Sequence, residues 1–428
     1  MPEIVAEAAS SLTGVDVDAS HGRLTYARWR PGKNCVLNWS LPDESGHPIL
    51  VSAKTFADRT AEKIVARRSF RALAEVTGGL HACFPERRLL LQVFPMDFAL
   101  PGLASVTSPE WARVAIASAL GVPQEEVRAV EATTLRYKAW RRCVLRFSAE
   151  VQGRPIRHYA KAFRDDRGED MLQRLRNLGE QMAARGSPWR IAAPSSYSRE
   201  VRTLLFPEVE GAVELKALAR EARTSARHGR ALREHVSSTA SGLASFREAI
   251  VDGVPRVTSR EILDDLATDA EPLADVLPEL ALSIAGLLRD LESEADRMPP
   301  EPLGATHGAL RIDQLLFCGD EPVGLDLDGL CLSGPASDPG YFLADLDRTA
   351  VRRPSLRPLM AECEKAFSSA LETDHLVDPR WLAWHRAANH VKLALRCVFT
   401  ISRGWPEAAE GLIGVARRTL GELAAARS

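Results

Sequence analysis

Apolar and polar positions follow two different patterns along the chain. In the first half, short stretches rich in strand-forming residues, such as Cys35-Val36-Leu37 and Arg88–Pro95, alternate with turns and with the helical spacing of Thr60–Glu75 and Ser108–Leu120. From 215 to 300, leucine and isoleucine recur at roughly helical spacing. The chain is therefore predicted to be an α+β protein whose C-terminal part is mainly helical.

An internal repeat occupies the first half, with a spacing of about 107 to 111 residues. Both copies end in the pattern A-K-x-F-x-D-x-x-x-E, with Lys54 in the first copy and Lys161 in the second. Cys35 precedes Lys54 by 19 residues, and Cys143 precedes Lys161 by 18, a difference that a hairpin turn absorbs. Each copy is predicted to be a strand, a hairpin turn, a strand that carries the lysine, a helix (Thr60–Glu75 or Gly168–Ala184) and a further strand (Arg88–Pro95 or Arg202–Pro207).

Composition makes the two lysines more informative. Only eight of the 55 basic residues are lysine, so arginine is the ordinary surface cation of this chain. Lysine offers a compact point charge where arginine offers a planar fork. A lysine on a strand, followed by a glutamate on the next helix, forms the ion pair that directs an ammonium toward phosphates in kinase-type small lobes. For a single copy, two unrelated surface charges would be the better explanation; two copies in a lysine-poor chain favour the functional one.

Overall charge and cysteine usage exclude several classes of protein. The 428 residues carry a net charge of -2, which gives no bulk attraction to nucleic acid or to anionic membranes. Seven cysteines are scattered without a CxxC pair, which argues against a zinc site and a disulfide scaffold. The N-terminus lacks the order of a signal peptide, and no apolar run reaches 18 residues. We expect a soluble cytoplasmic protein without a nucleic-acid or membrane partner.

Three motifs follow one another in the C-terminal half: His307-Gly308-Ala309 with Gln314 seven residues after the histidine, then Asp326-Leu-Asp328-Gly, then Asp338-Pro-Gly with a second aspartate at 345. This order resembles the aminoglycoside phosphotransferase and choline kinase-like family, relatives of the protein kinases. Their large lobe carries H-G-D-x-x-x-x-N, then I-D-F/W, then G-D-P-x-x-D. The resemblance covers these motifs and the second copy of the repeat.

The resemblance implies a protein-kinase-like bilobal fold, with a small antiparallel-sheet lobe and a mainly helical large lobe. Residues 126–212 would be the nucleotide-binding small lobe and 213–428 the large lobe. Residues 1–125 would be an accessory, duplicated small-lobe-like unit, which offers extra surface for a protein partner. The implied cofactors are ATP and Mg²⁺.

The small-lobe residues take their implied roles from the second copy. Lys161 would contact the α- and β-phosphates, with Glu169 as its partner and Glu180 on the same helix as an alternative. The usual glycine-rich phosphate loop is absent, and Arg141 and Arg142 would contact phosphate through guanidinium groups instead.

The hinge and the metal site follow in the same way. Leu205–Gly211, with Phe206 and Glu208, would receive the adenine through backbone groups. Asp326 matches the magnesium-binding aspartate, and Gln314 stands where the family has a metal-binding asparagine, on a side chain one methylene longer.

In the catalytic loop, His307 is expected to be an architectural hydrogen-bonding residue, and Asp338 and Asp345 are expected to hold the loop. The family's catalytic base lies two residues after the histidine, where this chain has Ala309, which cannot accept a proton. Asp313 on the same loop and Asp328 are the candidate replacements. Asp328 would share a face with Asp326 if that segment were a strand.

Two main functions remain open, besides a third in which the fold only binds a peptide through its first unit. The first is an ATP-dependent phosphotransferase that acts on a hydroxyl group of a small molecule, such as an amino sugar, or of a peptide serine or threonine. A loose transition state needs positioning and charge neutralisation more than a strong base, so Ala309 does not exclude transfer. The second is a catalytically impaired pseudokinase that binds nucleotide or a protein partner as a scaffold, as Ala309 and Gln314 suggest.

Overall fold

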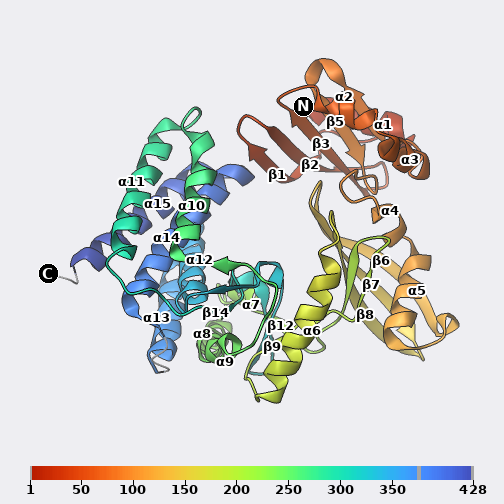
Figure 1. Cartoon of the computed structure of the whole chain (residues 1–428). Helices are drawn as coiled ribbons and strands as arrows, with labels where there is room; N and C mark the ends of the chain where they lie inside the picture. The colour runs from red at the N-terminus through yellow and green to blue at the C-terminus, as the bar shows by residue number, and fades with distance from the viewer. Residues whose placement is uncertain (1, 374–376, 426–428) are drawn as a thin grey trace. The chain divides into compact units, whose positions relative to one another are not determined.

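The structure is a computed structural model that describes residues 2–373 and 377–425 (Figure 1). Its described residues form two compact units. The first comprises Met1–Gln173, Pro194–Glu208 and Phe399–Ser402, and the second comprises Arg174–Ala193, Val209–Val398 and Arg403–Ser428. The strands of both copies of the repeat therefore belong to the first unit, whereas most of the helix of the second copy belongs to the second unit.

Two five-stranded antiparallel sheets form the first unit. One has the order β1-β2-β3-β5-β4, from β1 (Arg23–Arg30), β2 (Asn34–Pro42), β3 (Pro48–Phe56), β4 (His81–Phe84) and β5 (Leu89–Val93). The other has the order β6-β7-β8-β11-β10, from β6 (Val127–Lys138), β7 (Arg142–Val151), β8 (Arg154–Phe163), β10 (Ser196–Ser198) and β11 (Thr203–Pro207). The identical order of corresponding strands confirms the predicted repeat.

The strand register places the two lysines at the same point of their sheets. Each stands opposite a valine and a leucine of the neighbouring strands: Val36 and Leu90 for Lys54, Val144 and Leu204 for Lys161. The residue before β5 and the residue before β11 are also both arginines with a φ of 50°, Arg88 and Arg202. The correspondence thus extends to single backbone conformations.

The helices of the repeat region follow the prediction with two differences. The helix predicted over Gly168–Ala184 is α6, with those bounds, and α5 runs over Pro109–Leu120. The single helix predicted over Thr60–Glu75 is instead α2 (Thr60–Val65) and α3 (Arg68–Val76), because Arg67 adopts an extended ψ of 140°. The chain also has α4 (Leu103–Val106) and an unpredicted α1 (Pro2–Thr13), whose Val5, Ala6 and Ala9 are buried in the core of the first sheet.

The second unit is mainly helical, as expected. Its helices are α7 (Leu215–Glu221), α8 (Ala226–Ser241), α9 (Leu243–Arg247), α10 (Ser259–Ala270), α11 (Pro278–Ala295), α12 (Ser337–Arg352), α13 (Arg357–Thr373), α14 (Pro379–Thr400) and α15 (Trp405–Ala425). Two small sheets carry the motif loops. One has the order β12 (Val213–Glu214), β15 (Leu315–Cys318), β16 (Glu321–Gly324), β9 (Arg190–Ile191), and the other β13 (Arg256–Val257), β17 (Cys331–Ser333), β14 (Gly304–Thr306).

Two expectations about the chain as a whole can be compared with the structure. All seven cysteines are free thiols, as their scattered positions predicted. Among the described helices, none combines the length and the apolar character that a membrane span requires.

Candidate functional site

The loop that follows β14 is held in place by a buried carboxylate. Asp338, only 3% exposed at the start of α12, accepts hydrogen bonds from the backbone amides of His307 (2.6 Å) and Gly308 (3.0 Å). Burial raises the pKa of Asp338, while His307 and the two amides oppose that rise. Asp345 acts in the same way, because it accepts from the Ile312 amide (3.4 Å) and pairs with Arg348. Both aspartates therefore hold the loop, as predicted.

His307 ties this loop to the segment after β16. Its ring is buried, and Nε2 lies 2.8 Å from the carbonyl oxygen of Leu325, so Nε2 carries a proton and donates it. In the other direction, the Leu325 amide donates to the carbonyl of Gln314 (2.8 Å). The histidine thus links the two motif loops, and the Gln314 backbone lies beside the residue that precedes Asp326. Its architectural role stays a prediction.

Gly308 has no room for a side chain. Its φ is 76°, and an added Cβ would lie 2.0 Å from the carbonyl oxygen of Gly329. Replacement Gly308→Ala is expected to lower the free energy of unfolding by about 2 kcal/mol, since both the backbone strain and the contact with another backbone oppose it. Chemical denaturation measures the change. The control is Gly319→Ala, at a φ of 60° with open space around it; equal losses in the two variants would show that the contact with Gly329 is unimportant.

Gln314 has the features of a metal ligand. It ends the 3-10 turn Ile312–Gln314, its side chain is only 3% exposed, and its Oε1 is buried without a hydrogen-bond partner among the described residues. A buried, unpaired amide oxygen is costly unless something binds it, and Mg²⁺ prefers oxygen ligands. No group of three or more histidine, cysteine, aspartate or glutamate side chains in the described chain suits a metal ion. A site with one carboxylate, from Asp326, and one amide oxygen, from Gln314, has the kind of ligands that Mg²⁺ takes, because this ion usually binds few protein ligands together with phosphates and water.

The segment after β16 differs from the expected strand. β16 ends at Gly324, Asp326 has a left-handed φ of 58°, and Leu327–Gly329 form a 3-10 turn. The alternation of a strand therefore does not apply, and the inference that Asp326 and Asp328 share a face for that reason is wrong. Asp328 is exposed, whereas Asp326 is half-buried.

Asp313 is already engaged by two cations. One carboxylate oxygen lies 3.3 Å from Nε of the buried Arg311, and the other lies 3.9 Å from Nζ of Lys216 on α7. The Asp313 carboxylate therefore lies beside two positive charges. Ala309, half-buried in the same loop, adds no acceptor.

In the first unit, Lys161 lies on β8 with a side chain that is 8% exposed, and its Nζ lies 5.3 Å from the centre of the Phe163 ring. Glu169, in the first turn of α6, forms an exposed ion pair with Arg199. The predicted pairing of Glu169 with Lys161 stays a prediction.

The predicted hinge residues lie at the end of β11. Phe206 pairs with Tyr159 of β8, and the amide of Glu208 donates to the Arg157 carbonyl (3.1 Å) while its side chain forms an ion pair with Arg157 (3.2 Å). Because the Glu208 amide is committed to the sheet, an adenine contact in this segment has to come from another group.

Arg141 lies in the tight turn between β6 and β7, and Arg142 begins β7. The Arg141 amide donates to the carbonyl of Lys138 (3.1 Å). Burial lowers the pKa of the Arg141 guanidinium, and the nearby Arg28 lowers it further. Since Arg28 belongs to β1, the first copy of the repeat approaches this turn of the second copy.

Lys54, the counterpart of Lys161, contacts aromatic rings. Its Nζ lies 3.8 Å from the centre of the Trp140 ring and 4.9 Å from that of Phe56. Burial lowers its pKa to about 8, although the negative charge of Asp97 opposes that shift. The sequence motif around the two lysines is the same, but their surroundings differ.

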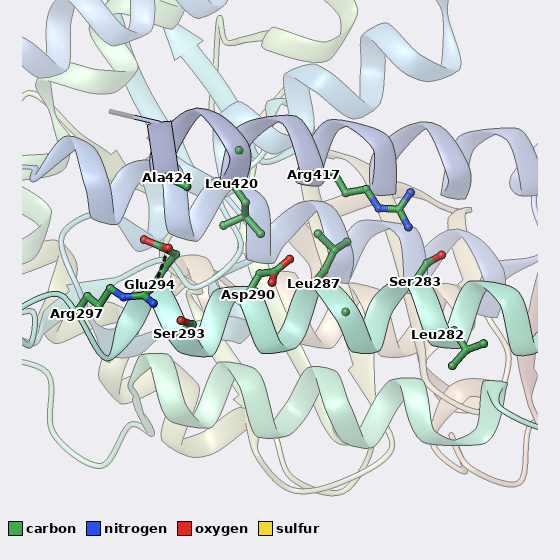
Figure 2. Close-up of a pocket in the computed structure, with 12 residues that line it drawn as sticks. Leu282, Ser283, Leu287, Asp290, Ser293, Glu294, Arg297, Arg417, Leu420 and Ala424 are labelled. Carbon is green, nitrogen blue, oxygen red and sulfur yellow. Dashed lines mark hydrogen bonds and ion pairs between the residues drawn. The ribbon is translucent and has the colours of Figure 1, made fainter. Parts of the chain in front are cut away.

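Cavity volume does not identify the site. A cavity of about 600 Å³ lies between α11 and α15, with Leu287, Asp290, Arg417 and Leu420 around it (Figure 2). A second cavity of about 610 Å³ lies in the first unit, beside Phe98 and Arg164. Neither is lined by a residue to which the sequence assigns a catalytic, phosphate-binding or metal-binding role, although Asp165 of the repeat motif lines the second.

Comparison with known proteins supports the fold. No protein-family model and no curated protein sequence matches the chain. Among solved structures, a glucosamine kinase in complex with glucosamine, ADP and inorganic phosphate has 15% identity and a TM-score of 0.50, and the match covers 74% of this chain and 88% of that one. A choline kinase from Cryptosporidium parvum Iowa II has 11% identity and a TM-score of 0.50, with coverage of 72% and 95%. The chain has the fold of the choline and glucosamine kinases.

This fold is the one that the order of the motifs implied. A thermostable mutant of an aminoglycoside phosphotransferase is also similar, with 14% identity, a TM-score of 0.47 and coverage of 72% of this chain and 97% of that one. The α+β architecture, with antiparallel sheets before a mainly helical part, agrees with the kinase-like fold expected from the sequence.

Proposed function

We propose that the protein is an ATP-dependent phosphotransferase that acts on a hydroxyl group of a small molecule. The observation that carries the proposal is the buried Oε1 of Gln314, which has no hydrogen-bond partner among the described residues, in a loop whose backbone is hydrogen-bonded to the residue before Asp326. The similar solved structures include small-molecule kinases, one of them in complex with ADP, which supports nucleotide use.

Each proposed contact has its own residue. Lys161 binds the α- and β-phosphates, and Arg141 and Arg142 add guanidinium contacts to phosphate oxygens. Asp326 and Gln314 hold Mg²⁺, which supplies charge neutralisation to the phosphate oxygens when it is bound.

Transfer then depends on positioning rather than on a strong base. A loose transition state places little demand on proton removal from the attacking hydroxyl. Asp313, held by Arg311 and Lys216, and the exposed Asp328 are the carboxylates that would orient this hydroxyl. The acceptor is a hydroxyl-bearing small molecule, with amino sugars as the first trial set and a peptide serine or threonine as the second.

A pseudokinase that binds nucleotide without transfer is the second candidate. It is favoured by Ala309 at the position of the base and by the two cations that already engage Asp313. The two candidates differ in turnover: a phosphotransferase consumes ATP in proportion to added acceptor, whereas a pseudokinase does not.

Mg-ATP is expected to stabilise the protein, because a ligand that binds only the folded state shifts unfolding to higher temperature. At about 100 times its Kd the nucleotide adds about 2.7 kcal/mol, which corresponds to a rise in Tm of about 5 °C or more for units of this size. A thermal-shift titration measures this, with ATP in EDTA as the comparison for the metal. An unchanged Tm at millimolar Mg-ATP would contradict both candidate functions.

A further inference from the structure

The two copies of the repeat differ at one turn. Gly32 and Trp140 occupy equivalent positions before the second strand of their sheets, with φ values of 66° and 65°. In both turns the next amide donates to the carbonyl three residues back, Lys33 to Arg30 (3.0 Å) and Arg141 to Lys138 (3.1 Å). A left-handed backbone suits glycine but is strained for a bulky residue. Something must therefore hold Trp140 in this conformation.

The first copy holds the backbone of this turn. Asp97, which is 0% exposed, accepts at Oδ2 from the Trp140 amide (2.8 Å) and from the Tyr137 hydroxyl (3.0 Å), and at Oδ1 from the Ala99 amide (2.9 Å). Asn38 of β2, also buried, donates to the Tyr137 carbonyl (3.0 Å). Two buried polar side chains of the first copy thus fix both sides of the turn in the second.

The first copy also surrounds the indole of Trp140. The ring centres of Phe56 and Phe98 lie 6.3 Å and 6.2 Å from that of Trp140, in edge-on contact. The Lys54 ammonium lies over the indole at 3.8 Å, a distance at which a desolvated cation is strongly attracted to the ring. Trp140 is therefore held by its amide and by its ring.

Asp97 lies in the part of the first copy that corresponds to the proposed adenine hinge. The Phe94 amide donates to the Leu50 carbonyl (2.9 Å), as the Glu208 amide donates to the Arg157 carbonyl (3.1 Å) in the second copy. The lysine and the hinge segment of the first copy thus both bind Trp140. The space beside the Lys54 ammonium is therefore occupied by side chains of the protein itself, the rings of Trp140 and Phe56.

We propose that the first copy clamps the Lys138–Arg142 turn of the second, and that Lys54 and Asp97 are positioning residues for the phosphate contacts of Arg141 and Arg142. This inference rests on the proposed function, because those contacts are part of it. It gives the duplicated unit a task within the same chain, whereas the predicted protein partner of this unit stays a prediction.

The clamp is expected to weaken at alkaline pH. The charged groups that face Lys54 are Asp97 after β5, Arg30 on β1 and Arg164 after β8, and burial together with the two arginines lowers the Lys54 pKa from 10.5 to about 8. Loss of the proton removes the attraction to the indole and the charge near Asp97. The same titration stabilises the fold, because the unfolded chain still binds that proton between about pH 8 and 10.5. A loss of nucleotide affinity in this range therefore cannot come from unfolding at this lysine.

Hydrogen exchange tests the clamp without any nucleotide. In Lys54→Met and in Asp97→Asn, the amides of the turn at 138–142 are expected to exchange about tenfold faster than in the unaltered protein. Lys63→Met, which alters an exposed lysine on α2, is the matched control and should leave them unchanged. Unchanged exchange in both clamp variants, with the fold intact by circular dichroism, overturns the inference.

Nucleotide affinity supplies the second measurement. The Kd for Mg-ATP of the unaltered protein and of Lys63→Met is expected to rise about fivefold from pH 7 to pH 9, while Lys54→Met is equally weak at both pH values. Trp140→Gly serves if Lys54→Met fails to fold, because glycine adopts this φ without strain; it should weaken binding to a similar degree. If the unaltered protein binds Mg-ATP and the Kd of Lys54→Met changes with pH in the same way, the clamp is overturned and the proposed function is not. Absence of binding by the unaltered protein overturns the proposed function, and the exchange rates still decide on the clamp.

Discussion

Replacing Lys161 with methionine is expected to weaken Mg-ATP binding by about 100-fold, as loss of a buried, charge-assisted phosphate contact does. Lys161 lies on β8 with only 8% of its surface exposed, in the copy of the repeat that directly precedes the helical part of the chain. Methionine keeps most of the length and the apolar stem of the side chain and removes the charge. Isothermal titration calorimetry with Mg-ATP measures the change.

The control for this result is the same substitution in the other copy. Lys54 occupies the same register position but lies over the Trp140 ring, so Lys54→Met acts through the turn alone and is expected to weaken binding only about fivefold. A larger loss in Lys54→Met than in Lys161→Met would show that the nucleotide binds to the first copy.

The repeat could be predicted because its pattern is local. The lysine, the preceding Cys-Val-Leu strand and the following helix lie within a short stretch, so the hydrophobic period and one hairpin turn determine their arrangement. β4 and β10 could not be predicted in this way, because strands of four and three residues are too short to show a hydrophobic period. The strand order within each sheet depends on contacts between distant segments, and the sequence indicates it only through the duplication itself.

The different surroundings of Lys54 and Lys161 could not be predicted from the sequence. Asp97 reads in the sequence as a break in an apolar run, and nothing near it indicates that it accepts a hydrogen bond from Trp140. The sequence pattern matches Trp140 with Trp29 of the first copy, and only the backbone shows that its counterpart at the turn is Gly32. Asp326 shows the same limit, because its left-handed backbone interrupts the strand that the sequence predicts there.

The candidate site also has one part that could be predicted from the sequence and one part that could not. The resemblance implies the roles of His307 and Asp338, and the structure shows the hydrogen bonds that both make at the motif loops. The partners of Asp313 come from Lys216 on α7 and from Arg311 two residues away, and only the structure brings the distant lysine to the loop.

Restoring an aspartate at position 309 is expected to raise kcat for phosphoryl transfer by about 100-fold, with little change in the KM for ATP, because a positioned general base contributes on this scale. The loop that would carry it is already fixed by Asp338 and His307, and Ala309 is half-buried beside them. Steady-state kinetics with the amino sugar acceptors measures the gain.

Ala309→Asn is the matched control for this gain, since it has the same shape but cannot accept the proton of the acceptor hydroxyl as a carboxylate does. A higher kcat in Ala309→Asp alone would show that the acceptor hydroxyl lies next to this position. It would also show that the missing carboxylate is what limits transfer in the unaltered protein. If both variants keep the original rate while Asp313→Asn loses transfer, position 309 is not where the proton is removed. Proton transfer would then have moved to a carboxylate held by Arg311 and Lys216, and the two cations would have to leave it basic enough for that task.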